Sequence, residues 1–285
     1  MTMIRTAKYM VGFTLIEVVI VIVLTGILGV VATSFFTPLQ GYFGALDRAE
    51  LSDVADTALR RMGRELHAAL PNSVRVSGNY IEFLPTITGG RYRANSAGGT
   101  AGCGSAGDDL SFSGNDTCFE VIGTLSTAPS VGQELVVYNT SNTSALGVYA
   151  NDNVAALTSD LACTLSATKI CFSGGMQFPL ESPSKRFQII SGPVTFACVG
   201  NTLWRYSGYA RQASQPTNVT SAPLSTATSI ARLATGVKCD TSNFSNMSGT
   251  TQRAGLATMS LTLSNSPDPL DSITLLHQVH VQNVP

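Results

Sequence analysis

The sequence has 285 residues, of which 17 are Lys or Arg and 18 are Asp or Glu, so its formal net charge is −1. Charged residues make up only 12% of the chain, and no basic region of the kind that binds nucleic acid or acidic lipid stands out. We therefore expect no nucleic-acid partner. Beyond the N-terminal apolar run, about 250 residues remain, enough for one large or two small domains with a buried core.

The first predicted element is an apolar helix over residues 13–36, whose 24 residues contain one charge, Glu17. A helix rises about 1.5 Å per residue, so this one spans roughly 36 Å and can cross a hydrocarbon core of about 30 Å. A carboxylate inside such a span costs on the order of 2.5–3.5 kcal/mol. We therefore expect Glu17 to have a partner that the chain meets only when it assembles with other subunits.

Two simpler explanations of the apolar run fit less well. A secretory signal peptide has an apolar core of about 7–15 residues with a small-residue cleavage site after it, whereas here the core is longer and Gly12 precedes it. A plain single-pass anchor explains the length but not Glu17 or the Gly12–Phe13 junction. Arg5 and Lys8 precede the run without an acid, so the positive-inside rule places the N-terminus in the cytoplasm and the rest of the chain across the membrane.

The helix is expected to continue outside the membrane over residues 37–70. Apolar side chains recur there at spacings of three and four residues, and they form one stripe along the helix. The stripe consists of Leu51, Val54, Ala55, Ala58, Leu59, Met62, Leu66 and Leu70. Pro71 ends the pattern, because the residue before a proline is pushed out of the helical region. A stripe of this kind is typical of a helix that packs on a sheet.

The exported remainder, residues 71–285, has the composition of a β-rich head, with Val, Ile, Leu and Phe in short runs between polar loops. The strand candidates are residues 74–76, 81–83, 134–138, 146–149, 187–190, 194–199, 202–206, 257–263 and 273–281. Gly200-Asn201 is a good two-residue hairpin turn, whereas residues 86–118, with Gly89-Gly90, and residues 211–229 have the composition of loops. The predicted fold class is α+β, a long N-terminal helix packed on an antiparallel head.

Six cysteines follow the predicted anchor. Export to an oxidising compartment favours disulfides. Six cysteines allow fifteen connectivities, and the sequence cannot choose among them. We favour sequential pairing, Cys103–Cys118, Cys163–Cys171 and Cys198–Cys239, because the first two bridges would hold loops that core packing could not order. Zinc is disfavoured, since no pair has the Cys-x-x-Cys spacing.

No motif of a hydrolase, a metalloprotease or a phosphate-binding loop is present in the sequence, so we expect neither an enzyme nor a cofactor. His277 and His280 fall on opposite faces of the last strand candidate and are not expected to share a metal, and His67 is expected to be solvated. Three aspartates in one polar loop could bind calcium, although a solvated acidic turn is the simpler interpretation. They are Asp108, Asp109 and Asp116.

The start of the chain carries a resemblance to a known family. Gly12-Phe13-Thr14-Leu15-Ile16-Glu17, after a short basic leader and before an uninterrupted apolar helix, resembles the class III signal of type IV prepilins and pseudopilins. The resemblance implies that a prepilin peptidase/methyltransferase removes residues 1–12 by cutting after Gly12 and then N-methylates Phe13. It also implies that Glu17 neutralises the N-terminus of a neighbouring subunit during assembly. The implied partners are other major and minor pilins and the inner membrane.

Three later segments resemble one branch of that superfamily. Residues 61–76, residues 193–206 with Cys198 and Trp204, and residues 275–285 are similar to the MshO family of minor pilin-like proteins in MSHA pilus biogenesis, which is related to J-type minor pseudopilins. The resemblance implies a periplasmic head on an inner-membrane anchor, followed by a place in the pilus filament, at or near its tip. One alternative is a J-type pseudopilin of type II secretion. The other is a tip adhesin that binds glycans on a platform of Trp204, Tyr206 and Tyr209.

Overall fold

The structure is a computed structural model that describes residues 12–95, 103, 107–142, 146–247, 255–265 and 272–281, with residues 35–44 described by their backbone alone. Residues 1–11, the greater part of the predicted leader, lie outside this set. The chain divides into two compact units, Met1–Glu50 and Leu51–Pro285. Helix α1, Leu15–His67, begins in the first unit and ends in the second.

The beginning of α1, from Leu15 to Ser34, is largely apolar and exposed. This segment is long and apolar enough to cross a membrane, and none of it is buried. The hydroxyl of Thr25 donates to the carbonyl of Val21 at 2.8 Å, and that of Ser34 donates to the carbonyl of Val30 at 3.0 Å. Such bonds back to the preceding turn satisfy hydroxyl groups inside the helix itself, which suits an apolar surrounding.

The second unit is an antiparallel β-rich head. Within the described residues its strands form three sheets, with the orders β1-β2-β9-β10-β11, β12-β13-β14 and β6-β5-β8-β3-β4-β7. The strands are β1 Arg75–Ser77, β2 Tyr80–Phe83, β3 Thr86–Tyr92, β4 Asp116–Ile122, β5 Glu134–Val137, β6 Val154–Ala156, β7 Lys169–Met176, β8 Arg186–Ile190, β9 Val194–Val199, β10 Thr202–Ser207, β11 Ser229–Thr235, β12 Asn243–Met247, β13 Gly255–Ser264 and β14 Ser272–Val281, with short 3-10 helices η1 Val148–Ala150 and η2 Leu224–Thr226. The fold class is therefore α+β, as predicted.

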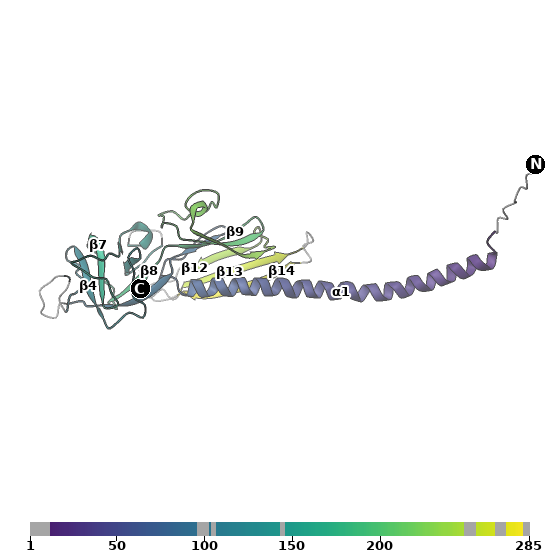
Figure 1. The fold of residues 1–285 in the computed structure, drawn as a ribbon, viewed down its shortest axis with the longest axis horizontal. Coiled ribbons are helices and arrows are strands. Elements are labelled where there is room, and N and C mark those ends of the chain that lie inside the picture. Colours follow the sequence, from purple (N-terminus) through teal and green to yellow (C-terminus); the bar gives the residue numbers. More distant parts are fainter. Residues whose placement is uncertain are drawn as a thin grey trace, which may run out of the picture. The chain divides into compact units, whose positions relative to one another are not determined.

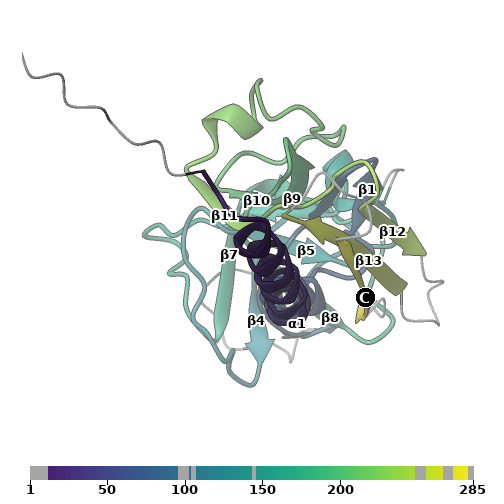
Figure 2. The ribbon, with the colours of Figure 1, turned by 90° about the vertical axis from the view of Figure 1, so that its right-hand side faces the viewer.

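The last five turns of α1 pack on the first two of these sheets, and we call this part the helix lobe. Its core combines the helical stripe, including Leu51, Leu59 and Met62, with Phe196 of β9 and Met259 of β13. Figures 1 and 2 show β9 and β13 beside this end of α1. The predicted stripe therefore packs on a sheet, because burying it removes a continuous row of apolar side chains from water.

The helix ends three residues before the predicted boundary at Leu70. After His67 the backbone turns, and the Leu70 amide donates to the carbonyl of Leu84 at 2.7 Å. The Thr86 amide donates to the carbonyl of Ala68 at 2.8 Å. These bonds to the segment between β2 and β3 replace the last helical turn, so tertiary pairing overrides the apolar spacing that extended to Leu70.

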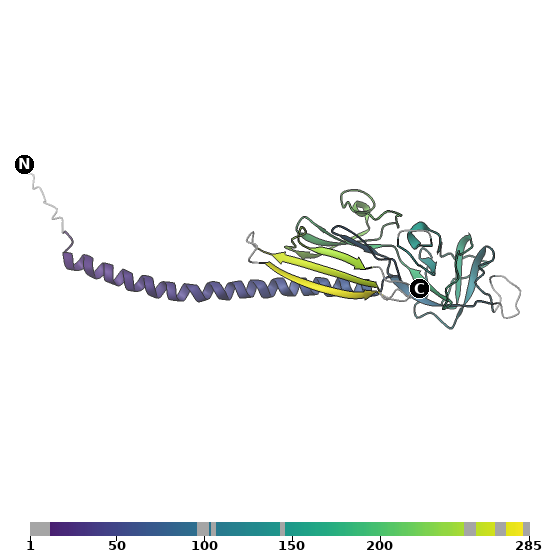
Figure 3. The same cartoon turned by 180° about the vertical axis from the view of Figure 1, so that it is seen from behind.

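The remaining sheet forms a second lobe, which we call the six-strand lobe. It has its own core, centred on rings such as Phe119, Phe172 and Phe187. Figures 1 and 3 show β4 and β7 of this lobe beyond the end of α1, apart from β13 and β14. A small cluster that includes Leu70, Leu84 and Ile190 lies where the chain passes between the lobes.

Several predicted strands form, and two predictions fail. Residues 86–118 are not all loop, because they contain β3 and the start of β4. Gly89 and Gly90 lie inside β3, where a Cβ at Gly89 would come within 2.9 Å of the Phe187 carbonyl oxygen. The glycines allow close packing there, so they do not mark a turn. Residues 146–149 are not a strand, since Val148–Ala150 forms the 3-10 helix η1.

The predicted hairpin at Gly200-Asn201 is present. It joins β9 to β10, and both turn residues have positive φ, 57° at Gly200 and 61° at Asn201. Two consecutive left-handed residues make the turn whose twist matches that of the flanking strands. This turn fixes the register of the strands that carry Thr195, Cys198 and Trp204.

Candidate functional site

The predicted cleavage and assembly residues lie at the start of α1. Gly12 and Phe13 precede the helix, and Phe13 is 80% exposed. Thr14 caps the helix, because the Glu17 amide donates to the Thr14 carbonyl at 3.1 Å and to its hydroxyl at 3.3 Å. Glu17 therefore occupies the first turn, where a negative charge also interacts favourably with the helix dipole.

The carboxylate of Glu17 is the one polar group of this segment that the helix does not satisfy. Among the described residues, no hydrogen bond or ion pair reaches the Glu17 carboxylate, whereas the hydroxyls of Thr25 and Ser34 bond to the helix backbone. The neighbouring side chains Leu15, Ile16 and Val18 are exposed and apolar. The arrangement places one unsatisfied negative charge on an otherwise apolar helix that could serve as a membrane anchor or a signal sequence.

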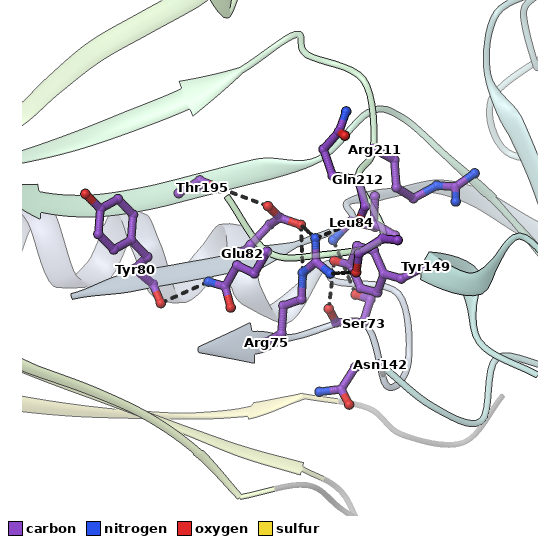
Figure 4. Close-up of polar contacts among 12 residues, drawn as sticks. Ser73, Arg75, Tyr80, Glu82, Leu84, Asn142, Tyr149, Thr195, Arg211 and Gln212 are labelled. Atoms are coloured by element: carbon purple, nitrogen blue, oxygen red, sulfur yellow. Dashed lines mark hydrogen bonds and ion pairs between the residues drawn. The ribbon is translucent and has the colours of Figure 1, made fainter. Parts of the chain in front are cut away.

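A second group of polar residues is buried in the head. Arg75 of β1 and Glu82 of β2 face each other across the hairpin, and Nη2 of Arg75 lies 2.6 Å from Oε1 of Glu82. The Arg75 guanidinium also stacks on the ring of Tyr149, at 3.6 Å from its centroid. Thr195 and Tyr209 donate to the other Glu82 oxygen at 3.3 and 3.1 Å. We call these five residues the buried polar cluster, and Figure 4 labels Arg75, Glu82, Tyr149 and Thr195.

Burial governs the ionisation of this cluster. It raises the pKa of the Glu82 carboxyl, and the Arg75 guanidinium with the hydrogen bonds to that carboxyl opposes the rise. Burial also raises the pKa of Tyr209 and of Tyr149, with the Glu82 charge adding to both shifts. The two phenols therefore stay protonated and act as hydrogen-bond donors, Tyr209 to Glu82 and Tyr149 to the carbonyl of Ser73 at 3.0 Å.

The buried polar cluster joins segments of both lobes. Arg75 donates to the carbonyls of Gln212 and Ala213 at 2.9 and 2.7 Å, which fixes the loop after β10. In the same loop Arg211 forms a fork with Glu134 of β5, at 3.2 and 2.7 Å, and donates to the carbonyl of Val148. Arg75 and Ala213 also line a pocket of about 440 Å³. Because the Arg75 guanidinium is already engaged by Glu82 and by two backbone carbonyls, we assign the cluster a structural role.

The sequence contains one signal for this cluster, the opposite charges of two residues in neighbouring strand candidates. Arg75 and Glu82 lie in two neighbouring strand candidates, residues 74–76 and 81–83, and they are Cα partners in the hairpin of β1 and β2. Opposite charges at directly opposed positions stabilise a strand pair. Their burial, 6% exposed for Arg75 and 0% for Glu82, depends on Tyr149 and Tyr209 from distant segments and is not visible in the hairpin sequence.

The six cysteines form three disulfides, Cys103–Cys118, Cys163–Cys171 and Cys198–Cys239. These are the sequential pairs favoured from the sequence. Cys118 and Cys171 are directly opposed on β4 and β7, so the first two bridges lie side by side. The sulfurs of Cys103, Cys118 and Cys163 come within 4.8 Å of one another. Because all three are held in disulfides, they offer no thiolate to a metal ion.

Two candidate ligand sites from the sequence are occupied by internal contacts. Asp116 accepts hydrogen bonds from the amides of Ser111 and Thr117 at 2.8 and 2.7 Å, which is how an aspartate holds a turn. Of the three aromatic residues of the expected glycan platform, Tyr206 and Tyr209 are buried and Trp204 is partly buried beside them. These three residues therefore do not form an exposed platform.

Comparison with known proteins adds no relative. No protein-family model, no curated protein and no solved structure matches the chain.

Proposed function

We propose that this chain is a minor pilin-like subunit that helps to initiate, or occupies the tip of, an MSHA-type type IV pilus. In this proposal a prepilin peptidase cuts between Gly12 and Phe13 and methylates the new amine. Residues 13–36 hold the subunit in the inner membrane, with the head, residues 71–285, in the periplasm. During assembly the N-terminal helix moves from the membrane into the filament, where it packs against the helices of other pilins.

One observation carries the proposal, the unsatisfied carboxylate of Glu17 on an apolar, exposed helix. Holding such a charge in a membrane costs on the order of 2.5–3.5 kcal/mol. The amine that cleavage creates on Phe13 of a subunit is a cation that can pair with a neighbour's Glu17 away from water. Losing one partner of a buried ion pair costs about 3–5 kcal/mol, which is enough to make assembly depend on this residue.

The size of the head favours a low copy number of this subunit in the filament. The head is large, and three disulfides stabilise its loops. A head of this size would crowd the surface of a filament in which every subunit carried one. A subunit present once or a few times, at or near the tip, avoids that crowding.

The test must separate the charge of Glu17 from its place in the first helical turn. Glu17→Gln removes the charge but keeps a side chain that suits this capping position, whereas Glu17→Asp keeps the charge. We expect both variants to insert and to be cut after Gly12, as read by mass spectrometry of the N-terminus. Incorporation into sheared filaments, measured by quantitative mass spectrometry, should fall at least about 100-fold for Glu17→Gln and much less for Glu17→Asp.

Gly12→Glu is the processing control. A Cβ at Gly12 meets no described atom within 4 Å, so this change leaves the fold alone and acts only on the peptidase. The variant should keep residues 1–12 and should not assemble. Normal incorporation of Glu17→Gln, or an unprocessed wild-type chain that still begins at Met1, would contradict the proposal.

A further inference from the structure

A cavity of about 410 Å³ lies between the end of α1 and strand β14. The helix contributes Arg60, Gly63, Arg64 and His67, and the strand contributes His277, Gln278, Val279 and His280. The whole chain contains three histidines, and all three are among the residues that line this cavity. As expected from the sequence, His277 and His280 lie on opposite faces of β14, with His277 on the face covered by α1 and His280 exposed. We call it the histidine–arginine pocket.

Gly63 allows the pocket to form. A Cβ at this position would lie 2.8 Å from Nε2 of His277 and 3.2 Å from a methyl group of Val279. A glycine inside a helix costs about 1 kcal/mol relative to alanine, and here the missing side chain gives the His277 imidazole its space against the helix. Gly63 therefore lowers the stability of the helix at the point where the His277 side chain packs against it.

The pocket is lined by groups of positive or potentially positive charge. No aspartate or glutamate is among its lining residues. Arg60 pairs with Asp56 at 2.6 Å, one turn earlier on the helix. For Arg64, His67, His277 and His280, the described residues supply no hydrogen-bond or ion-pair partner. These four side chains are therefore free to bind a molecule from outside.

The arginines decide which kind of ligand fits. Three histidines could suggest a metal ion, but their ring nitrogens do not gather within ligating range of one another among the described residues. Two guanidinium groups beside them would also repel a cation. A guanidinium presents a fork of N–H donors that matches the two oxygens of a carboxylate or a phosphate, and a charged imidazole adds further donors.

We propose that the histidine–arginine pocket binds an oxyanion, the carboxylate or phosphate group of another molecule. Arg60 and Arg64 line the pocket beside the imidazoles and supply guanidinium groups to such a ligand. This inference stands on the pocket alone and does not depend on the proposed function.

The three histidines provide a direct measurement. In the full chain, purified in detergent micelles and labelled with ¹³C in histidine, three imidazole signals report on the pocket by NMR. Inorganic phosphate is one probe and a tri-glutamate peptide is the other, so the two arms distinguish a phosphate from a carboxylate ligand. We expect the three signals to shift along one saturating curve as the probe is added.

Matched variants locate the site. Arg64→Gln should weaken binding at least about tenfold, and Gly63→Ala should weaken it without any change of charge by displacing His277. Arg232→Gln, an exposed arginine on β11 outside the pocket, should leave the affinity unchanged. Shifts that never saturate, that involve a single histidine, or that persist in Arg64→Gln would overturn the proposal.

Discussion

Arg75 and Glu82 show how two charges are kept inside a head that has few charged residues. Glu82 is fully buried, and its carboxylate accepts hydrogen bonds from Arg75, Thr195 and Tyr209. Each partner comes from a different strand or loop, so the pair is satisfied only in the complete fold. A buried pair of this kind contributes little by its presence but is costly to break.

Arg75→Met should therefore lower the free energy of unfolding by about 3–5 kcal/mol. The deficit should also depend on pH, since Arg75 is what opposes the raised pKa of Glu82. Without Arg75, the pKa of Glu82 in the folded protein rises further above its value in the unfolded chain. The protein then keeps its stability at pH values below the unfolded-state pKa and loses stability as the pH rises toward the folded-state pKa. Urea unfolding of the full chain, followed by the fluorescence of Trp204, should give a larger deficit near pH 8 than near pH 5.

Arg186→Met is the control for this measurement, because Arg186 is exposed on β8. It should change the free energy of unfolding by less than about 0.5 kcal/mol. A deficit for Arg75→Met that grows as the pH falls would contradict the account given for Glu82.

At this scale the sequence identifies some residues and not others. Glu17 is recognisable because a charge in an apolar helix is conspicuous whatever the fold around it. The cysteine pairs follow chain order, the pairing favoured because two of the bridges hold polar loops, although the sequence alone allows fifteen connectivities. The buried polar cluster and the histidine–arginine pocket are different, because Arg75 meets Tyr149, and Gly63 meets His277, only after distant segments have folded together.

Among the elements, β3 departs most from its sequence pattern. Its Gly90 faces the six-strand core, where a Cβ would lie 2.9 Å from a methyl group of Leu125 and 3.1 Å from the ring of Phe187. The residue that looks like a loop signal is thus a packing position. The cost of a glycine in a strand is offset by the close approach of β3 to its neighbours.

Gly90→Ala should therefore destabilise the protein by about 1–3 kcal/mol, as overpacking does in a dense core. Gly114→Ala is a matched control, since a Cβ at Gly114 has no described atom within 4 Å. It should be neutral or slightly stabilising, because alanine restricts the unfolded chain. Thermal unfolding of both variants measures the difference, and equal midpoints would show that Gly90 is not a packing position.

The helix and the long strands could be predicted from the sequence, whereas the short and polar strands could not. The stripe of α1 and the alternation in β13 and β14 are strong because each buries one face over many residues. Strands β6, β7, β11 and β12 have no such signal. β6 has three residues, β7 contains Gly174 and Gly175, and β11 is largely exposed. They exist because the neighbouring strand is already in place.

At the scale of the whole head, the two cores are joined by an apolar cluster that includes Leu70, Leu84 and Ile190 and by a set of polar contacts. Arg211 connects the loop after β10 with Glu134 of β5 and with η1, and so links the helix lobe to the six-strand lobe. Hydrogen bonds to charged groups contribute about 1.5–3 kcal/mol each. The bonds of Arg211 therefore add to the apolar cluster in holding the two lobes together.

Arg211→Ala should let the six-strand lobe open more often than the helix lobe. Amide hydrogens of β5 and η1 should exchange roughly 10–100-fold faster than in the wild type, while those of β9 and β10 change little. Hydrogen exchange followed by mass spectrometry measures both sets in one experiment, with Arg186→Ala as the control. Equal acceleration in the two lobes would mean that Arg211 stabilises the head as a whole and does not link its parts.

The place of β14 has a consequence for unfinished copies of the protein. Val279 and Val281 of β14 share one core with Leu51 and Met62 of the helical stripe, although more than two hundred residues separate the two pairs along the chain. A translation product that stops short of Ser272 would carry that stripe partly bare. The free energy gained by burying that stripe is therefore complete only when β14 has been made and has packed on the helix.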